Sequence, residues 1–240
     1  MKVVAVMTRA PQAPVDATLD GSGTVSVPVV AGPKTRLAPA LPDAADREAL
    51  QRAMLADVLT RARAVSGAIV RVAVTPGGSP DALADVGVAP GHVLTQQGES
   101  LGDRMRGVFA DLFRRGARQV LVVGSDLPLL TTAILDEAFA ALAADPRHVV
   151  LGPASDGGYY LLGLHAPQVP DLFTGVRWST KYALMDTLRR CEFEERRVTF
   201  LPILDDVDEP ADLERLRATL AAAPDLAPHT AAAVAIARGR

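Results

Sequence analysis

Two hydrophobic patterns alternate along the chain. Short runs rich in Val, Ile and Leu, typical of buried strands, occupy residues 2–7, 68–75, 93–96, 119–124, 148–153, 158–164 and 198–204. Between them, apolar residues recur at the spacing of amphipathic helices, starting near Asp43 and again over 101–116, 131–144, 180–190 and 210–223. This alternation predicts one α/β domain in which helices flank a mostly parallel sheet.

Two segments depart from the alternation. Residues 158–164 follow 148–153 too closely for a helical crossover, which predicts a hairpin or an antiparallel strand. Residues 10–31 are rich in Pro and Gly, and within them 24–30 would form only a short edge strand, because Pro28 lacks a ladder donor. A connection of this length is usually functional or disordered. We therefore predict a domain over 1–223 with an insert at about 10–31, followed by a tail or short helix over 224–240.

Composition and charge narrow the function classes. The 240 residues are 49% hydrophobic and 22% charged, with a net charge of −3, as in a globular protein with a large core. No clustered Lys and Arg indicate nucleic-acid binding, and no apolar run approaches the ~20 residues of a membrane span. The first residues turn polar too soon for a signal peptide, and the lone Cys191 has no disulfide partner, so we expect a cytoplasmic protein.

Candidate chemistry gathers where the predicted strands end, which is where ligands bind in such sheets. After the first strand and the insert, Gly32, Lys34, Thr35 and Arg36 form a tight loop. Two cations two residues apart suit a di- or triphosphate, although a solvated loop is the plain alternative. The Walker A and G-x-G-x-x-G patterns are absent from the sequence.

A carboxylate also follows a central strand. Residues 119–124 lead directly into Ser125 and Asp126, and a carboxylate at such a strand tip can hold Mg²⁺ or Mn²⁺. The alternative is a turn Asp that caps the next helix, but Thr131 lies closer to the start of that helix.

Two further turns carry acids. Asp156, Gly157 and Gly158 have hairpin-turn chemistry, and of Tyr159 and Tyr160 one would face the core and the other a cleft. Farther on, the last strand leads into three acids, of which a helix cap at Asp208 or Glu209 would explain one. The crowded acids are Asp205, Asp206 and Asp208.

Two stretches are open to either interpretation. Gln97, Gly98 and Asp103 could recognise a base or ribose, although Ser100 would serve as a plain helix cap. Trp178 would be either a core residue or a cleft wall, next to the candidate caps Ser179 and Thr180.

Together these stretches resemble a known family. The motifs are GPKTRL (32–37), QGESLGDRM (97–105), GSDLP (124–128), GPASDGGYYLLGL (152–164), WST (178–180) and DVDEPADL (206–213). In this order they are similar to a group of bacterial GT-A-fold proteins described as glycosyltransferases, some associated with radical-SAM or selenium-related proteins. The chain is more distantly similar to the guanylyltransferases of molybdenum-cofactor and phospholactate metabolism. The insert at 10–31 departs from this pattern and would form a lid, a partner surface or a disordered segment.

The resemblance implies a nucleotide-diphospho-sugar transferase fold and assigns roles to residues. Lys34 and Arg36 would meet the nucleotide phosphates, Asp126 and Asp208 would bind Mg²⁺ or Mn²⁺, and Asp156 would face the acceptor. An inverting sugar transfer would also need a base, for which the place of Asp156 in the turn beside Tyr159 makes it the candidate. The other implied substrate-binding residues are Gly32, Thr35, Gln97, Gly98, Asp103, Arg104, Ser125, Gly157, Gly158, Tyr159, Trp178, Ser179 and Thr180.

The resulting prediction is a metal-dependent glycosyltransferase that moves a sugar from a nucleotide-diphosphate sugar to a small-molecule acceptor. The first alternative is a nucleotidyltransferase that uses an NTP and releases pyrophosphate, since the same loop and metal would serve it. The second is a nucleotide-binding module without turnover. The sequence leaves the donor, the acceptor and the oligomeric state open.

Overall fold

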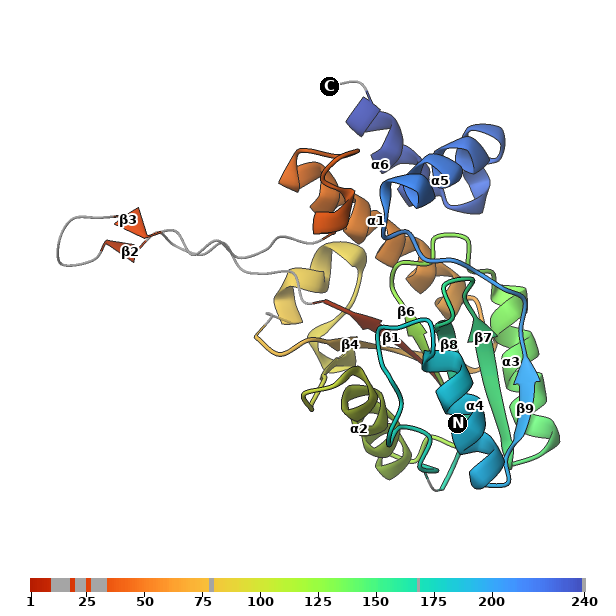
Figure 1. Cartoon of the computed structure of the whole chain (residues 1–240). Helices are drawn as coiled ribbons and strands as arrows, with labels where there is room; N and C mark the ends of the chain where they lie inside the picture. Colours follow the sequence, from red (N-terminus) through yellow and green to blue (C-terminus); the bar gives the residue numbers. More distant parts are fainter. Residues whose placement is uncertain (10–17, 20–24, 27–33, 78–79, 168, 239–240) are drawn as a thin grey trace.

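A seven-stranded sheet forms the centre of the molecule (Figure 1). The computed structural model describes residues 1–9, 18–19, 25–26, 34–77, 80–167 and 169–238. Strand β8 runs antiparallel to both of its neighbours, and the other pairings in this sheet are parallel. In spatial order the strands are β5 (Val93–Thr95), β4 (Ala68–Val74), β1 (Lys2–Thr8), β6 (Gln119–Gly124), β8 (Tyr159–His165), β7 (His148–Pro153) and β9 (Arg197–Phe200).

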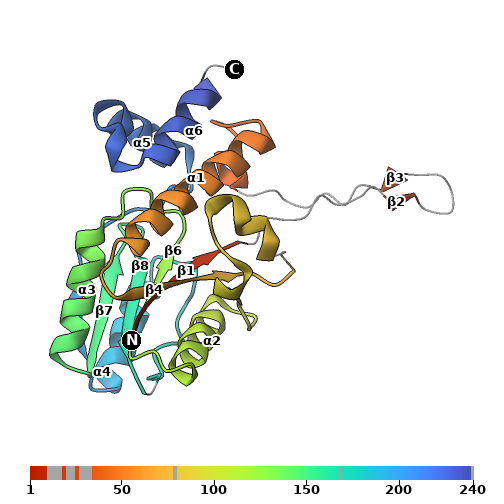
Figure 2. The same cartoon turned by 180° about the vertical axis from the view of Figure 1, so that it is seen from behind.

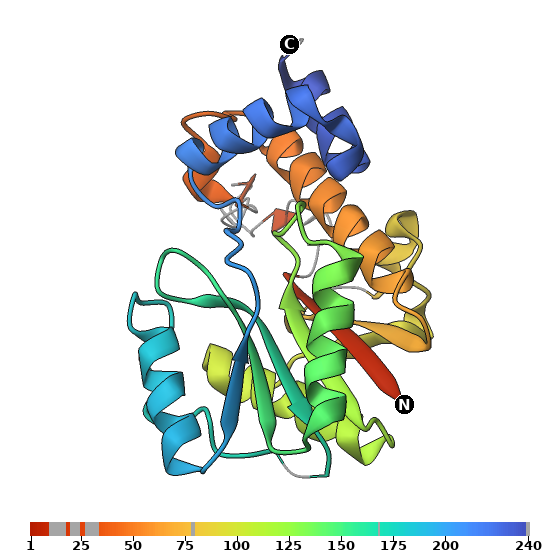
Figure 3. The same ribbon diagram turned by 90° about the vertical axis from the view of Figure 1, so that its right-hand side faces the viewer.

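Helices cover both faces of this sheet. Helices α1 (Ala44–Arg63) and α3 (Thr132–Ala144) pack on one face, and α2 (Leu101–Arg114) and α4 (Ala183–Phe193) pack on the other. Figure 3 views the sheet from the side of α3, with α2 behind the strands. The predicted mostly parallel α/β fold is therefore confirmed.

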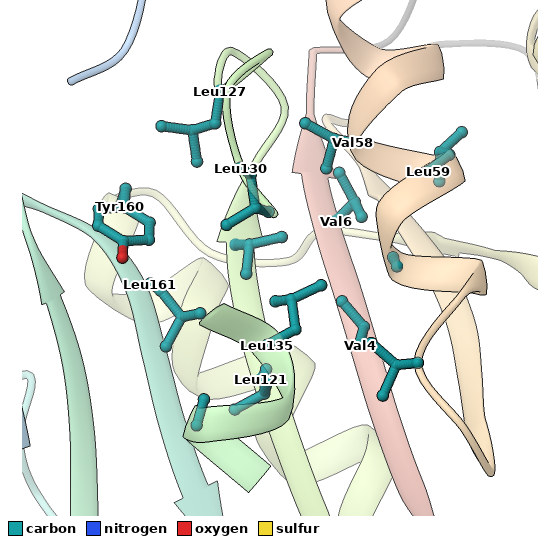
Figure 4. Close-up of a cluster of buried hydrophobic side chains, with 14 of the residues drawn as sticks. Val4, Val6, Val58, Leu59, Leu121, Leu127, Leu130, Leu135, Tyr160 and Leu161 are labelled. Carbon is teal, nitrogen blue, oxygen red and sulfur yellow. The ribbon is translucent and has the colours of Figure 1, made fainter. Parts of the chain in front are cut away.

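The strand sequences explain why both faces are covered. In β1, Val4 and Val6 belong to the core under α1, whereas Val3 and Ala5 belong to the core on the opposite face. Figure 4 shows Val6 beside Val58 of α1, with Val4 farther along β1. Because successive strand residues point to opposite sides, a continuous apolar run needs a helix layer on each side.

A third apolar cluster lies beyond the end of the sheet where β1 and β6 finish. There the first half of α1 packs with α5 (Pro210–Ala222) and α6 (Pro228–Arg238) (Figure 2). The same cluster includes Leu37 of the short helix η1 (Thr35–Leu37). The Asp57 carboxylate of α1 accepts hydrogen bonds from the first turn of α6, so the predicted tail or short helix is a helix joined to the domain.

Several element boundaries follow the sequence signals. Helix α1 begins after Asp43, whose carboxylate accepts from the Ala45 N–H at 2.8 Å, and α3 begins after Thr131, whose hydroxyl accepts from the Ile134 N–H at 3.3 Å. Helix α2 ends at Arg114, with Gly116 just beyond it at φ 88°. Asp and Thr are common helix N-caps, and glycine readily takes the left-handed conformation that ends a helix.

Other boundaries differ from the prediction, among them the end of β9 and the start of α4. Strand β9 ends at Phe200 rather than 204, because Pro202 has no N–H to continue the ladder. The Leu201 and Leu204 N–H groups still donate to carbonyls of β7. Helix α4 begins at Ala183 rather than 180, because the Thr180 hydroxyl accepts the Tyr182 N–H in a preceding turn.

The insert is described in part. Strands β2 (Thr18–Leu19) and β3 (Val25–Ser26) pair antiparallel in a sheet of their own. The rest of residues 10–31, and Gly32 with it, lies outside the described residues. Among the described helices, none has the length and apolar character needed to cross a membrane.

Candidate active site

One pocket of about 550 Å³ opens at the end of the sheet where β1, β6 and β7 finish. Because β8 is antiparallel, it begins at this same end and brings Tyr159 with it. The pocket therefore lies where ligands bind in open α/β sheets, as the sequence predicts.

The Lys34 ammonium contacts three oxygen atoms in the pocket. Its Nζ is 2.7 Å from Asp126 Oδ2 and 3.5 Å from Asp208 Oδ1, and it donates to the Val207 carbonyl at 2.6 Å. The side chain is buried, with 5% of its surface exposed. A buried ammonium is stable only when such partners replace water, so these oxygens fix its position.

Arg36 forms the outer part of the same arrangement. Its Nη1 donates to Asp208 Oδ2 at 2.8 Å, while 69% of its side chain remains exposed. Both cations of the loop thus contact Asp208, and the guanidinium faces solvent at the mouth, where it can meet an anionic group.

The segment after β9, residues 201–209, passes the ends of β8 and β6 and carries Asp205, Asp206 and Asp208. The Tyr160 hydroxyl donates to the Pro202 carbonyl at 2.9 Å, and the Val207 N–H donates to the Asp126 carbonyl at 3.1 Å. Glu209 is the residue that precedes α5, which leaves the Asp208 side chain to the pocket.

The three crowded acids have different roles. Asp205 faces the β7–β8 turn, where hydrogen bonds from the Ser155 hydroxyl and N–H lower the pKa of its carboxyl. Asp206 lines the pocket, and desolvation in the pocket wall raises its pKa to about 6. The Lys34 ammonium opposes that increase, and the carboxylates of Asp208, Asp126 and Asp156 add to it.

Asp126 and Asp208 suit a divalent cation. Both carboxylates already face one cationic centre, the Lys34 ammonium, and carboxylate oxygens are the donors that Mg²⁺ and Mn²⁺ prefer. Within the described residues, no group of three or more His, Cys, Asp or Glu side chains forms a complete metal cage. Mg²⁺ commonly takes one or two carboxylates and completes its shell with water and substrate phosphates.

The β7–β8 turn forms the next wall. Asp156 Oδ1 accepts from the Gly158 N–H at 2.8 Å, and both residues line the pocket. Gly157 has φ 87°, and a Cβ there would lie 2.2 Å from the Lys181 carbonyl oxygen. Only glycine allows the loop before α4 to pack on this turn.

Aromatic side chains form the apolar wall. Trp178 meets Tyr159 edge to face, with 6.2 Å between ring centroids, and stacks on Phe173 at 6.3 Å. Its indole lies on Gly102 of α2, where a Cβ would come within 2.6 Å of Nε1. Trp178 is thus both partly buried and a pocket wall, and burial raises the pKa of the Tyr159 hydroxyl.

Some predicted residues lie outside the pocket lining. Asp103 closes a capping box with Ser100, its Oδ2 accepting the Ser100 hydroxyl at 2.6 Å, and Arg104 donates to the Gly98 carbonyl at 3.1 Å. These contacts shape the start of α2 and the residues just before it, which include Gln97. A substrate-binding role for Gln97, Gly98, Asp103 and Arg104 stays a prediction. Ser125 donates to Asp126 Oδ1 at 3.1 Å and so helps to orient that carboxylate.

Gly157 also lies outside the lining, and the other predicted residues that the structure describes line the pocket together with further residues. Lys34, Thr35, Arg36, Asp126, Asp156, Gly158, Tyr159, Trp178, Ser179, Thr180 and Asp208 all line it. The sequence prediction missed Arg9, Gln51 and Lys181, and it named Asp206 as one of the crowded acids without giving it a role. Lys181 directly follows the W-S-T motif, so its position beside that motif was the available signal.

Comparison with known proteins identifies the family. The family described as "Uncharacterized protein conserved in bacteria (DUF2064)" matches residues 55–180. The chain belongs to this DUF2064 family. A phosphoenolpyruvate guanylyltransferase of Sphaerobacter thermophilus is 31% identical over 185 residues, which cover 76% of this chain and 86% of that protein. A 2-phospho-L-lactate guanylyltransferase of Halobacterium salinarum is 32% identical over 181 residues, covering 75% and 77%.

Solved structures support the fold of this DUF2064 protein. A putative nucleotide-diphospho-sugar transferase from Desulfovibrio desulfuricans G20 aligns with a TM-score of 0.79 at 24% identity, covering 99% of this chain and 97% of that one. A CMP:2-keto-3-deoxy-manno-octonic acid synthetase complexed with CTP aligns with a TM-score of 0.53 at 16% identity, covering 92% and 98%. The predicted nucleotide-diphospho-sugar transferase fold is confirmed.

The comparisons also change the ranking of functions. They support a transferase of the nucleotidyltransferase kind, because the relatives above 30% identity are named guanylyltransferases. The first sequence prediction, sugar transfer, is less well supported than its alternative, since the sugar-transferase neighbour shares only the fold. The predicted association with radical-SAM or selenium-related proteins and the link to molybdenum-cofactor enzymes stay predictions.

Proposed function

We propose that this DUF2064 protein transfers a guanylyl group from GTP to a small phosphorylated carboxylate and releases pyrophosphate. The observation that carries the proposal is the Lys34 ammonium, buried between Asp126 and Asp208 with Arg36 beside it at the pocket mouth. The names of the relatives supply the donor and the acceptor class, phosphoenolpyruvate or 2-phospholactate. The pocket volume is within the usual range for small-molecule sites.

The reaction follows from the charges of the site. A phosphate oxygen of the acceptor attacks the α-phosphorus of GTP, a new P–O–P bond forms, and the bond from the α-phosphorus to the oxygen bridging to the β-phosphorus breaks. The electron pair and the negative charge leave with pyrophosphate. Lys34 and Arg36 would stabilise that charge, which is the main electrostatic demand of phosphoryl chemistry.

Such an acceptor needs no general base. An ionised phosphate is already a nucleophile, unlike the sugar-acceptor hydroxyl for which Asp156 was predicted as the base. The Asp156 carboxylate instead accepts the Gly158 N–H and shapes the β7–β8 turn. Nucleotidyl transfer to a phosphate therefore requires no proton transfer by Asp156.

Asp126 and Asp208 are the residues that would hold Mg²⁺ or Mn²⁺. The ion would supply charge neutralisation at the nucleotide phosphates. Ser125 would keep the Asp126 carboxylate oriented through its 3.1 Å hydrogen bond.

Product analysis tests the proposal. The protein with Mg²⁺ is mixed with each of four NTPs and with phosphoenolpyruvate or 2-phospholactate, and pyrophosphate and the dinucleotide-like product are measured by phosphate assay and mass spectrometry. We expect pyrophosphate only when GTP and an acceptor are both present. Asp126→Ala should lower the rate by about 100-fold or more, whereas Asp136→Ala, an exposed position on α3, should leave it unchanged.

Two outcomes would contradict the proposal. Release of a nucleoside diphosphate from a nucleotide sugar would restore the sugar-transfer prediction. Nucleotide binding without turnover with any donor would favour the non-catalytic module.

A further inference from the structure

Lys181 is a pocket cation without a carboxylate partner. Lys34 and Arg36, two other cations of the pocket, are paired with Asp126 and Asp208. No carboxylate of the described residues lies within ion-pair distance of Lys181, whose Nζ is 5.4 Å from the centroid of the neighbouring Tyr182 ring. Arg9 also lines the pocket, but it adjoins residues outside the described part, and we assign it no role.

The loop that carries Lys181 is held firmly. Arg177 donates to Asp186 through Nε at 2.8 Å, through Nη2 at 2.9 Å and through its N–H at 3.1 Å. The Thr180 hydroxyl donates to the Arg177 carbonyl at 2.7 Å. On the other side, the Leu184 N–H donates to the Gly157 carbonyl at 3.0 Å. The positions of residues 178–181 are therefore set before any ligand binds, which lowers the entropic cost of binding.

Ser179 is the second polar group that this loop presents. Its φ is 58°, a left-handed conformation that a non-glycine residue adopts at a cost and that occurs often at ligand sites. Within the described part of the chain its hydroxyl makes no hydrogen bond, whereas the Thr180 hydroxyl is occupied on both sides. Ser179 and Lys181 both line the pocket, so a residue with a hydroxyl that has no hydrogen-bond partner in the described part and a residue with an ammonium that has no carboxylate partner there border the same space.

The Lys34–Arg36 pair and the Ser179–Lys181 pair lie on different walls of the pocket. Lys34 and Arg36 belong to the η1 loop beside the segment after β9, and Lys181 belongs to the loop before α4, packed on the β7–β8 turn. Asp156 and Asp206 also line the pocket, so an anion entering there would be repelled unless a cation compensates for it. Lys181 is placed to provide that compensation.

We propose that Ser179 and Lys181 form the subsite that binds the anionic acceptor, a phosphorylated carboxylate, while Lys34 and Arg36 bind the nucleotide phosphates. This inference rests on the proposed function. It assigns acceptor selectivity to the loop before α4, and it makes neither residue a participant in breaking the nucleotide bond.

Steady-state kinetics separate the two subsites. In Lys181→Met we expect the KM for phosphoenolpyruvate to rise about 10- to 100-fold, the loss for removing one charge-assisted contact, while kcat and the KM for GTP change less than about twofold. Ser179→Ala should raise the same KM by about threefold to tenfold. Lys181→Arg keeps the charge and should recover most of the affinity.

A direct binding measurement decides the inference even without turnover. Phosphoenolpyruvate is titrated calorimetrically into the wild type, Lys181→Met and the control Arg114→Met, an exposed position on α2 outside the pocket lining. Weaker binding by Lys181→Met alone supports the subsite. Equal binding by all three proteins, or no binding by the wild type, overturns it. A wild type that binds phosphoenolpyruvate through Lys181 but releases no pyrophosphate would contradict the proposed function and leave the subsite standing.

Discussion

At the scale of single residues, Lys34 determines which charges the Asp126 and Asp208 carboxylates face. Its backbone has φ 54°, and its ammonium joins three chain segments by contacting Asp126, Val207 and Asp208. The ammonium occupies the place between two carboxylates where a divalent cation would be attracted. A metal ion at these carboxylates would therefore compete with Lys34 for the same oxygens until a nucleotide offers the ammonium new partners.

This competition can be measured with Mn²⁺ alone. Lys34→Met should bind Mn²⁺ at least about tenfold more tightly than the wild type in the absence of nucleotide, because one positive charge beside the carboxylates is removed. The same variant should lose transfer activity by about 100-fold or more. Electron paramagnetic resonance titration gives the affinity, and Lys34→Arg is the control that keeps the charge. Equal or weaker Mn²⁺ binding by Lys34→Met would contradict the competition.

Asp186 allows a prediction about pH. Hydrogen bonds from the Arg177 side chain and N–H lower the pKa of Asp186 to about 2, below the ~3.9 of an unfolded Asp. The ionised carboxylate therefore stabilises the fold above about pH 4, and this contribution is lost as the pH falls towards 2.

Asp186→Asn should accordingly have a lower free energy of unfolding than the wild type at pH 7, and the difference should shrink between about pH 4 and pH 3. Urea unfolding at pH 7, 5, 4 and 3 measures it. Asp136→Asn, exposed on α3 and without an ion pair in the described structure, is the control. A difference that stays constant with pH would rule out the ion pair as its source.

At the scale of elements, close packing between loops and helices shapes the pocket. The β7–β8 turn, the loop before α4 and the start of α2 meet at Gly157 and Gly102, where no Cβ fits. Each glycine lies against a neighbour from a distant part of the sequence, Lys181 for one and Trp178 for the other. The walls of the pocket thus depend on two missing methyl groups.

Two glycines of α2 provide a matched test. Gly102→Ala should displace Trp178, because the new Cβ would lie 2.6 Å from its Nε1, and should weaken ligand binding about tenfold. At Gly107 a Cβ would meet only the Gln97 carbonyl at 3.5 Å, so Gly107→Ala should be neutral or stabilise by up to about 1 kcal/mol. Trp178 is the only tryptophan in the chain, so its fluorescence reports its environment directly. Unchanged emission in Gly102→Ala would contradict the packing.

At the scale of the whole molecule, the C-terminal helices support the η1 loop. Leu37 of η1 is fully buried in the cluster formed by α1, α5 and α6. Helix α6 is attached to α1 through Asp57, whose carboxylate accepts from the His229 and Thr230 N–H groups and the Thr230 hydroxyl. The last residues of the domain therefore hold in place the loop that carries Lys34 and Arg36.

Asp57→Ala tests this attachment. The variant would leave the first N–H groups of α6 without acceptors, so we expect it to lower the free energy of unfolding by about 2–3 kcal/mol. It should also raise the KM for GTP, because the η1 loop loses support. Urea unfolding and steady-state kinetics measure the two effects, with Asp136→Ala as the surface control. A change in unfolding free energy under about 0.5 kcal/mol would show that α6 does not depend on Asp57.

The sequence by itself determined the elements and the general position of the site. Continuous apolar strands and helical spacing are local patterns, and so are Asp43, Thr131 and Gly116 at helix ends, because each acts within a few residues of the chain. The rule that ligands bind beyond strand ends then predicts that Lys34, Asp126 and Asp208 lie in one site, with no knowledge of their contacts.

Only the tertiary structure decided which contacts each of those residues makes. The sequence separates Lys34 from Asp208 by 174 positions, and no local pattern shows that its ammonium lies between two carboxylates. The three neighbouring acids also have different contacts, which the sequence does not indicate. Asp205 accepts a hydrogen bond from Ser155, whereas Asp206 and Asp208 line the pocket. For Lys181 the sequence offered only its position after the W-S-T motif, because its backbone approaches Gly157 only after β7, β8 and α4 have assembled.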